Sequence, residues 1–176
     1  VSAALKLKKG DSFIFGKYQG EPIEWQVLDV EGGKALLLSR YGLDAKRYNE
    51  KRKAVTWEKC TLRQWLNQEF YKNAFSAGEQ NRIRKVNLVN ANNPKYGTAG
   101  GNNTEDQVFL LSIADAQKYF KDDSARKCIP TAYAKKQGAY VDKGTGTCYW
   151  WLRSPGFSQG IAAYVFSGGS VHYTGR

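Results

Sequence analysis

The residue types that carry most enzyme chemistry are scarce in this sequence. His172 is the only histidine, so a Ser-His-Asp or Cys-His arrangement would depend on one residue near the C-terminus. No P-loop occurs in the sequence. These observations disfavour an enzyme, and we predict no catalytic residue.

The three cysteines, Cys60, Cys128 and Cys148, are widely spaced and odd in number. This spacing matches neither a disulfide framework nor a CxxC metal pattern. We therefore predict that they are small buried hydrophobic residues, with one disulfide and a remaining thiol as the alternative. No metal ion and no cofactor is predicted from them.

An Asn- and Gly-rich segment, residues 87–106, is the candidate for binding a cation. Its oxygen-bearing side chains are those of Asn92, Asn93, Asn102, Asn103, Glu105 and Asp106. Calcium binds oxygens, but the spacing here does not match an EF-hand loop and neutral amides predominate. The sequence therefore favours a long loop built from Asn turns, with calcium binding as the alternative.

The C-terminal segment is the strongest candidate for binding a ligand. It begins with "CYWWLRSPG", residues 148–156, and continues in Tyr, Phe, Ser and Gly. Strand alternation places Cys148, Trp150 and Leu152 on one face and their sequence neighbours on the other. The second face has a composition close to that of antibody paratopes, which combine rigid aromatic rings with small polar residues. The predicted ligand-binding residues are Tyr149, Trp151, Arg153, Phe157, Gln159, Tyr164, Phe166, His172 and Tyr173. The alternative is that both faces are buried.

The chain is strongly basic, with a net charge of +11 from 27 basic and 16 acidic residues. The densest basic clusters lie in residues 46–53 and 82–85. Such a surface attracts polyanions non-specifically. No zinc finger or RNP-like motif accompanies the charge, so we predict a solubilising surface, with a nucleic-acid-binding module as the alternative.

No apolar run approaches the roughly 18 residues that a membrane span requires, and no signal-peptide pattern occurs at the start. The sequence begins at Val1 and contains no Met, so we expect it to be processed or excised from a longer chain. The sequence does not decide in which cellular compartment the protein works, but it favours a secreted or cell-surface location over a cytoplasmic one. The sequence makes no prediction of oligomeric state.

A chain of 176 residues fits one domain. Residues 22–30 and 34–41 flank "EGG" and predict a hairpin with glycine at positive φ. The second arm is nearly all apolar, which predicts a buried central strand. Residues 108–112 predict a further strand, and "SGG" at residues 167–169 predicts the turn into the last strand.

Three segments begin with the spacing of a capping box, in which a Ser or Thr side chain caps the helix. The pairs are Thr61 and Gln64, Ser76 and Glu79, and Ser112 and Asp115, for helices in residues 61–71, 76–86 and 112–120. A fourth helical turn is predicted at residues 130–138, with Pro130 at its first position and Gly138 as its stop.

The combined motifs resemble an uncharacterised bacterial domain family. Its members carry a W-L-R-S-P-G segment followed by an A-Y-V…G-x-V hairpin, found here at residues 151–156 and 163–171, and the resemblance spans about residues 10 to 174. The family's C-terminal pattern is similar to the C-type-lectin-like fold of the formylglycine-generating-enzyme and variable-protein type. The resemblance implies an α+β fold: a twisted, mostly antiparallel sheet, two or more helices and long loops.

Residues 1–9 are interpreted as an N-terminal extension and residues 10–176 as a single C-type-lectin-like domain. Members of the family continue into a closing strand, whereas this sequence stops at Arg176. A truncated, a swapped and a replaced closing strand remain as the three alternatives. Calcium-lectin motifs are absent. The cysteine pair of formylglycine-generating enzymes has no evident counterpart, because Cys128 and Cys148 are far apart in sequence.

Together these patterns predict a non-enzymatic binding module that recognises a protein or glycan ligand through the C-terminal hairpin face. The alternatives are an enzyme of the formylglycine-generating type and a basic nucleic-acid-binding module. Fold similarity alone does not transfer an activity.

Overall fold

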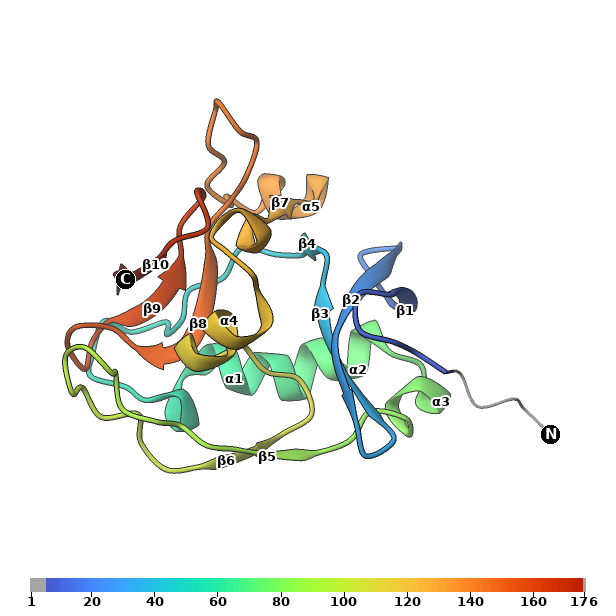
Figure 1. Ribbon diagram of the computed structural model, residues 1–176, viewed down its shortest axis with the longest axis horizontal. Helices are drawn as coiled ribbons and strands as arrows, with labels where there is room; N and C mark the ends of the chain where they lie inside the picture. The colour runs from blue at the N-terminus through green and yellow to red at the C-terminus, as the bar shows by residue number, and fades with distance from the viewer. Residues whose placement is uncertain (1–5, 176) are drawn as a thin grey trace.

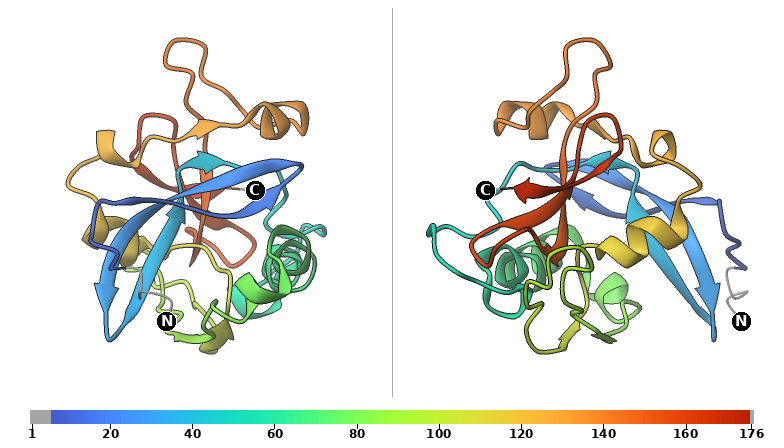
Figure 2. Two further views of the ribbon diagram at one scale, coloured as in Figure 1. Left: turned by 90° about the vertical axis from the view of Figure 1, so that its right-hand side faces the viewer. Right: turned by 60° about the vertical axis from the view of Figure 1, so that its left-hand side comes forward.

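The computed structural model describes residues 6–175. Two three-stranded antiparallel sheets stand side by side, with helices below them and a small parallel strand pair above (Figure 1, Figure 2). This parallel pair and one antiparallel two-stranded sheet complete the strands of residues 6–175. The α+β class and the mostly antiparallel pairing agree with the sequence, but the strands do not form one continuous twisted sheet.

The first sheet has the order β1-β2-β3, with β1 (Ser12–Tyr18), β2 (Glu21–Glu31) and β3 (Lys34–Ser39). Gly32 and Gly33 have φ values of 56° and 73°, which a two-residue turn with both central residues at positive φ requires. The predicted hairpin is therefore confirmed. The prediction of a central strand for its second arm was wrong: β3 lies at the edge, and its Leu36 and Leu38 pack on a core cluster beneath the second sheet.

The second sheet has the order β10-β9-β8, with β8 (Trp150–Pro155), β9 (Ala162–Val165) and β10 (Val171–Gly175). One face buries Leu152, Ala163 and Val165 against the helix α4 (Ile113–Tyr119). The predicted turn between β9 and β10 is present. Gly169 has φ 94° there, and a Cβ atom at this position would collide with the carbonyl oxygen of Asp123.

A helical run passes below both sheets (Figure 1). Its members are η1 (Trp57–Lys59), α1 (Thr61–Trp65), the π-turn η2 (Leu66–Phe70), α2 (Tyr71–Ala74) and α3 (Ala77–Gln80). The capping box of Ser76 and Glu79 is confirmed. That of Thr61 was wrong by one residue, because the sulfur of Cys60 accepts the N–H of Arg63 and caps α1.

Residues 108–112 do not form the predicted strand, because side chains satisfy their backbone groups in place of a neighbouring strand. The Asn67 amide donates to the carbonyl of Val108 at 2.8 Å, and the Arg153 guanidinium donates to that of Leu110 at 2.9 Å. The segment leads directly into α4, whose predicted capping box of Ser112 and Asp115 is confirmed.

The remaining elements are short. The strands are β4 (Tyr41–Gly42), parallel to β7 (Ile129–Pro130), and β5 (Val86–Leu88), antiparallel to β6 (Thr104–Asp106). The helices are η3 (Ser124–Arg126) and α5 (Ala132–Lys136). Pro130 does not open α5 as predicted, because it pairs in β7 and Thr131 caps the helix. Gly138, with φ 95°, follows the helix as the predicted stop.

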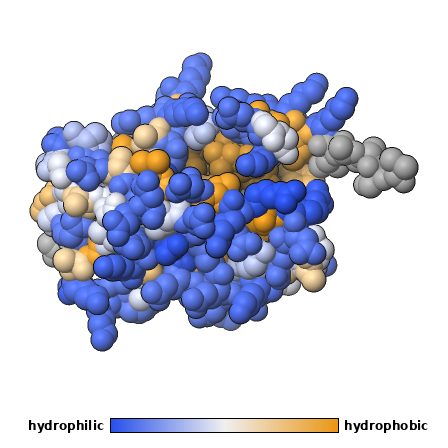
Figure 3. Space-filling model, turned by 90° about the horizontal axis from the view of Figure 1, so that it is seen from below, coloured by the Kyte–Doolittle hydropathy of each residue, from blue (hydrophilic) through white to orange (hydrophobic). Residues whose placement is uncertain are grey.

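Within residues 6–175, no helix is both long and apolar enough to cross a membrane. The face drawn in Figure 3 is mostly hydrophilic, and hydrophobic side chains appear on it in scattered patches.

The pair of Asp115 and Arg153 joins α4 to β8, with 2.6 Å between the carboxylate and the guanidinium. Burial by itself would raise the pKa of Asp115, but hydrogen bonds from Ser112 and the charge of Arg153 outweigh it and lower this pKa below its ordinary value. Because the folded pKa lies below the unfolded pKa of about 3.9, the stabilisation is complete above that pH and is lost as the pH falls through the folded pKa.

We therefore expect the free energy of unfolding in urea to fall as the pH drops below about 4. Asp115→Asn should flatten this fall, because the amide cannot take up a proton in the same range. Glu31→Gln changes an exposed carboxylate at the end of β2 and serves as the matched control. An acid-induced fall that is equally steep in Asp115→Asn and wild type would contradict the expectation.

Candidate functional site

Four aromatic rings stack in a continuous row on the outward face of the second sheet. We call Tyr140, Tyr149, Phe166 and His172 the aromatic ladder. The ring centroids of Tyr140 and Tyr149 are 4.5 Å apart, those of Tyr149 and Phe166 are 4.9 Å apart, and those of Phe166 and His172 are 4.9 Å apart. Every pair is stacked, with interplanar angles between 19° and 27°. The row therefore joins the loop that follows α5 and the residue before β8 to the β9–β10 turn and to β10.

Two further predicted residues extend this row across the sheet. The pairing register places Tyr164 opposite both Trp151 and His172. The rings of Trp151 and Tyr164 are T-shaped at 6.2 Å. The indole N–H of Trp151 donates to the carbonyl of Lys46 at 2.9 Å, which ties this side of the sheet to the segment between β4 and η1.

The ladder is open to solvent at one end and half-buried at the other. Tyr140 is 53% exposed and Tyr149 is 36% exposed, whereas Phe166 and His172 are partly covered. Because each ring covers a face of its neighbour, the row presents mainly ring edges and the two tyrosine hydroxyls to solvent. Burial raises the pKa of Tyr149, and the neighbouring Tyr140 hydroxyl raises it further, so this phenol stays protonated at neutral pH.

A cavity of about 670 Å³ lies beside the ladder. Its walls come from the first sheet, from β4, from α1 and η2, and from β8, and Tyr140, Tyr149, Trp151 and Tyr164 line one side of it. This volume is within the usual range for small-ligand sites. The aromatic face and the cavity are thus parts of one continuous surface.

The other predicted binding residues do not join this surface. Arg153 is only 7% exposed. Its guanidinium pairs with Asp115 and donates to the carbonyl of Leu110, and its backbone N–H donates to the carbonyl of Leu111. The expected alternation fails after Trp151, because the β8–β9 register shifts between Trp151 and Pro155. Gln159 donates to the carbonyl of Ala99 at 3.0 Å and so bridges two loops.

Phe157 and Tyr173 form a separate aromatic group with Tyr96. The Tyr96 ring lies 6.3 Å from that of Phe157 and 5.5 Å from that of Tyr173. The ammonium of Lys95 lies over the rings of both tyrosines, 5.3 Å and 5.8 Å from their centroids. Tyr173 packs on the core side of the second sheet, opposite the face that carries the ladder.

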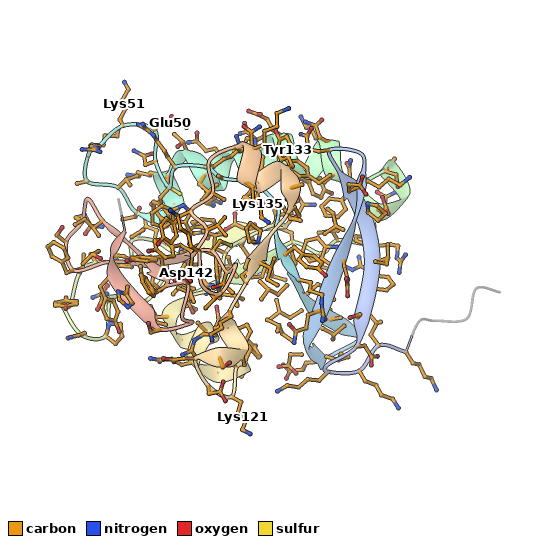
Figure 4. All side chains as sticks on the ribbon, turned by 90° about the horizontal axis from the view of Figure 1, so that it is seen from above. Glu50, Lys51, Lys121, Tyr133, Lys135 and Asp142 are labelled. Atoms are coloured by element: carbon orange, nitrogen blue, oxygen red, sulfur yellow. The ribbon has the colours of Figure 1, made fainter. Side chains whose placement is uncertain are left out.

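Sequence reasoning did not find Tyr140, the most exposed ring of the ladder. Tyr140 lies in the loop after α5, and only the fold brings that loop onto β8. The available signal was an aromatic residue directly after the helix stop at Gly138. Figure 4 shows Asp142 of the same loop, two residues further on, near the middle of the view from above.

The cysteines also differ from the prediction. Cys60 is fully buried, as predicted, and burial raises its pKa to about 11. Cys128 and Cys148, in contrast, are neighbours: they face each other in an antiparallel bridge. Their distance in sequence therefore does not separate them in the fold, and Cys148 is buried as predicted. All three cysteines are free thiols.

The Asn- and Gly-rich loop holds itself together with its own side-chain oxygens. Asn93 Oδ1 accepts the backbone N–H groups of Lys95 and Tyr96 at 2.9 Å and 3.0 Å. Asn92 Oδ1 accepts that of Gly100 at 3.1 Å. Within residues 6–175, no group of three or more His, Cys, Asp or Glu side chains is placed to hold a metal ion. The side-chain oxygens of Asn92 and Asn93 thus serve as turn acceptors.

The basic residues do not all lie on one side of the molecule. In Figure 4, Lys51 points outward at the tip of one loop and Lys121 points outward at the opposite edge of the molecule. Charges this far apart are screened from one another at physiological salt, where the Debye length is about 8 Å.

Comparison with family models matches residues 32–175 to a family described as a domain of unknown function (DUF6273). Comparison with curated proteins found no match, and neither did comparison with solved structures.

Proposed function

Because the chain belongs to the family of the domain of unknown function DUF6273, which brings no activity with it, we propose a function from the site: the domain is a non-enzymatic module that binds a protein or glycan ligand through the C-terminal hairpin face. The observation that carries the proposal is the exposed aromatic ladder beside the cavity.

Stacked aromatic rings that serve only the core would be covered. Tyr140 and Tyr149 are instead the most exposed members of a row whose other end is anchored in the sheet. Such rings supply large contact areas at a small cost in side-chain entropy, as tyrosines do in paratopes. The stacking fixes each ring against its neighbour, so a ligand would meet a preorganised surface.

The way in which the rings are stacked favours a protein ligand over a glycan. A flat ligand that stacks on an aromatic residue needs a free ring face, and most faces in the ladder are covered by neighbouring rings. Ring edges and tyrosine hydroxyls remain, and these suit the mixed apolar and hydrogen-bonding contacts of protein interfaces. The adjoining cavity would accept a side chain or a short chain segment of the ligand.

The test uses the purified domain on a peptide-display library and on a glycan array. Against any ligand found, Tyr149→Ala should weaken binding by about 10- to 100-fold, as the loss of a hot-spot aromatic residue does. Phe157→Ala is the matched control, because Phe157 is 44% exposed but lies in the other aromatic group. Equal losses of binding affinity in both variants would show that the ligand does not bind at the aromatic ladder.

Two further measurements on the purified domain address the alternatives. Submicromolar DNA binding that persists at physiological salt would favour a nucleic-acid-binding module over a solubilising surface. Oxygen-dependent oxidation of a cysteine-containing peptide would establish an enzyme of the formylglycine-generating type. The adjacency of Cys128 and Cys148 removes one sequence argument against that enzyme.

A further inference from the structure

Cys128 and Cys148 occupy directly opposed positions on antiparallel chain segments. The N–H of Cys148 donates to the carbonyl of Cys128 at 2.8 Å, and Cys148 also forms a bridge with Val141. Cys148 thus lies between the segment that precedes β7 and the segment that carries Tyr140 and Val141.

The sulfurs of both cysteines lie close to Gly42. A Cβ atom at Gly42 would lie 3.2 Å from the Cys148 sulfur and 3.8 Å from the Cys128 sulfur. The neighbouring thiol lowers the pKa of Cys148 and raises that of Cys128, which burial raises further. Cys148 is therefore the sulfur that more readily becomes a thiolate.

This arrangement meets the geometric needs of a disulfide. Opposed residues of antiparallel strands have Cα atoms about 4.5–5.5 Å apart, inside the range of about 4.4–6.8 Å that disulfides span. Both cysteines line the cavity beside the ladder, so a small oxidant has a route to them. Cys60 lacks such a partner, since it caps α1 in the core.

We propose that Cys128 and Cys148 are a redox-active pair that forms a reversible disulfide with a low-molecular-weight disulfide as oxidant, and that this bond locks residues 129–147 onto β8. One cysteine thiolate attacks the oxidant, forms a mixed disulfide and releases one small thiolate. The second cysteine thiolate displaces the other small thiolate and closes the bond. Two electrons pass to the oxidant, and its two released thiolates take up the protons that the cysteines lose.

The locked segment contains β7, α5 and Tyr140, the exposed end of the ladder. The oxidation state of the cysteine pair would therefore control how firmly Tyr140 is held against Tyr149, the residue next to Cys148. The disulfide itself does not depend on the proposed binding function, and its test needs no ligand.

The test exposes the wild-type domain, with a metal chelator present, to glutathione disulfide and then to dithiothreitol. We expect two of the three thiols to disappear, with Cys128 and Cys148 joined in one crosslinked peptide by mass spectrometry. Closing a loop of this length should raise the Tm by about 5–10 °C. Proteolytic cleavage at the exposed Lys143 should slow several-fold, and dithiothreitol should reverse all of these changes.

Cys128→Ser and Cys148→Ser should each abolish the crosslink and the Tm shift. Three persistent thiols in the wild type, stable glutathione adducts, or disulfide-linked dimers in place of the internal crosslink would each overturn the proposal. So would an internal crosslink that leaves both the Tm and cleavage at Lys143 unchanged, because the segment would then not be locked.

Discussion

Replacing Asp106 with alanine is expected to destabilise the domain by about 3–5 kcal/mol, the usual result of removing one partner from a buried ion pair. The Asp106 carboxylate is 1% exposed. It accepts the Arg63 guanidinium at 2.7 Å, the Trp57 indole N–H at 3.0 Å and the Thr104 hydroxyl at 2.8 Å. Alanine would leave all three donors without their acceptor in or near the core.

The measurement is urea unfolding of Asp106→Ala beside wild type. Ordinary domains have about 5–15 kcal/mol of stability, so the variant could be partly unfolded without denaturant. Glu105→Ala is the matched control: it removes the neighbouring carboxylate, which is exposed and lies 3.8 Å from Lys85, and should cost less than about 1 kcal/mol. Similar losses in both variants would show that Asp106 is not a central acceptor.

Asp106 also illustrates what the sequence could not show. In the sequence it is one of several polar residues in an Asn-rich segment, and its oxygens suggested a cation. The fold gives it Arg63 and Trp57, which are 43 and 49 residues away along the chain. No local pattern encodes such a partnership, because it depends on how the helical run and β6 pack together.

Local signals were accurate at three places where the chain satisfies its own backbone. The glycine pair between β2 and β3 and the capping boxes at Ser76 and Ser112 depend on neighbours within a few residues, and all are present. The predicted strand at residues 108–112 failed for the opposite reason. Its apolar run is typical of a strand, but Asn67 and Arg153, both remote in sequence, take its hydrogen bonds.

The candidate site shows the same division. Alternation along the chain identified Tyr149, Trp151, Tyr164 and Phe166, because strands direct alternate side chains to opposite faces. It misplaced Arg153, since the register shift in β8 interrupts the alternation. It could not reveal Tyr140 or the pairing of Cys128 with Cys148, because both depend on how the segment after β7 returns to β8.

Trp150→Ala is expected to cost roughly 3–5 kcal/mol, as large-to-small changes in a core do. Trp150 lies on the inner face of the second sheet and packs on the core cluster that contains Phe120 and Leu152. Its indole N–H donates to the carbonyl of Arg126 at 2.9 Å. The substitution would remove both the packing and the link between β8 and η3.

Tyr164→Ala and Phe166→Ala, on the opposite face, are the matched comparison and should each cost about 1 kcal/mol or less. They lose ring contacts, but their rings are partly exposed and neither ring packs on a core cluster. Urea unfolding of the three variants side by side measures the difference before any ligand is identified. If either outer substitution destabilised the domain as much as Trp150→Ala, both faces of the sheet would be core. The ladder would then be a packing element, and a ligand would have to bind at the loops.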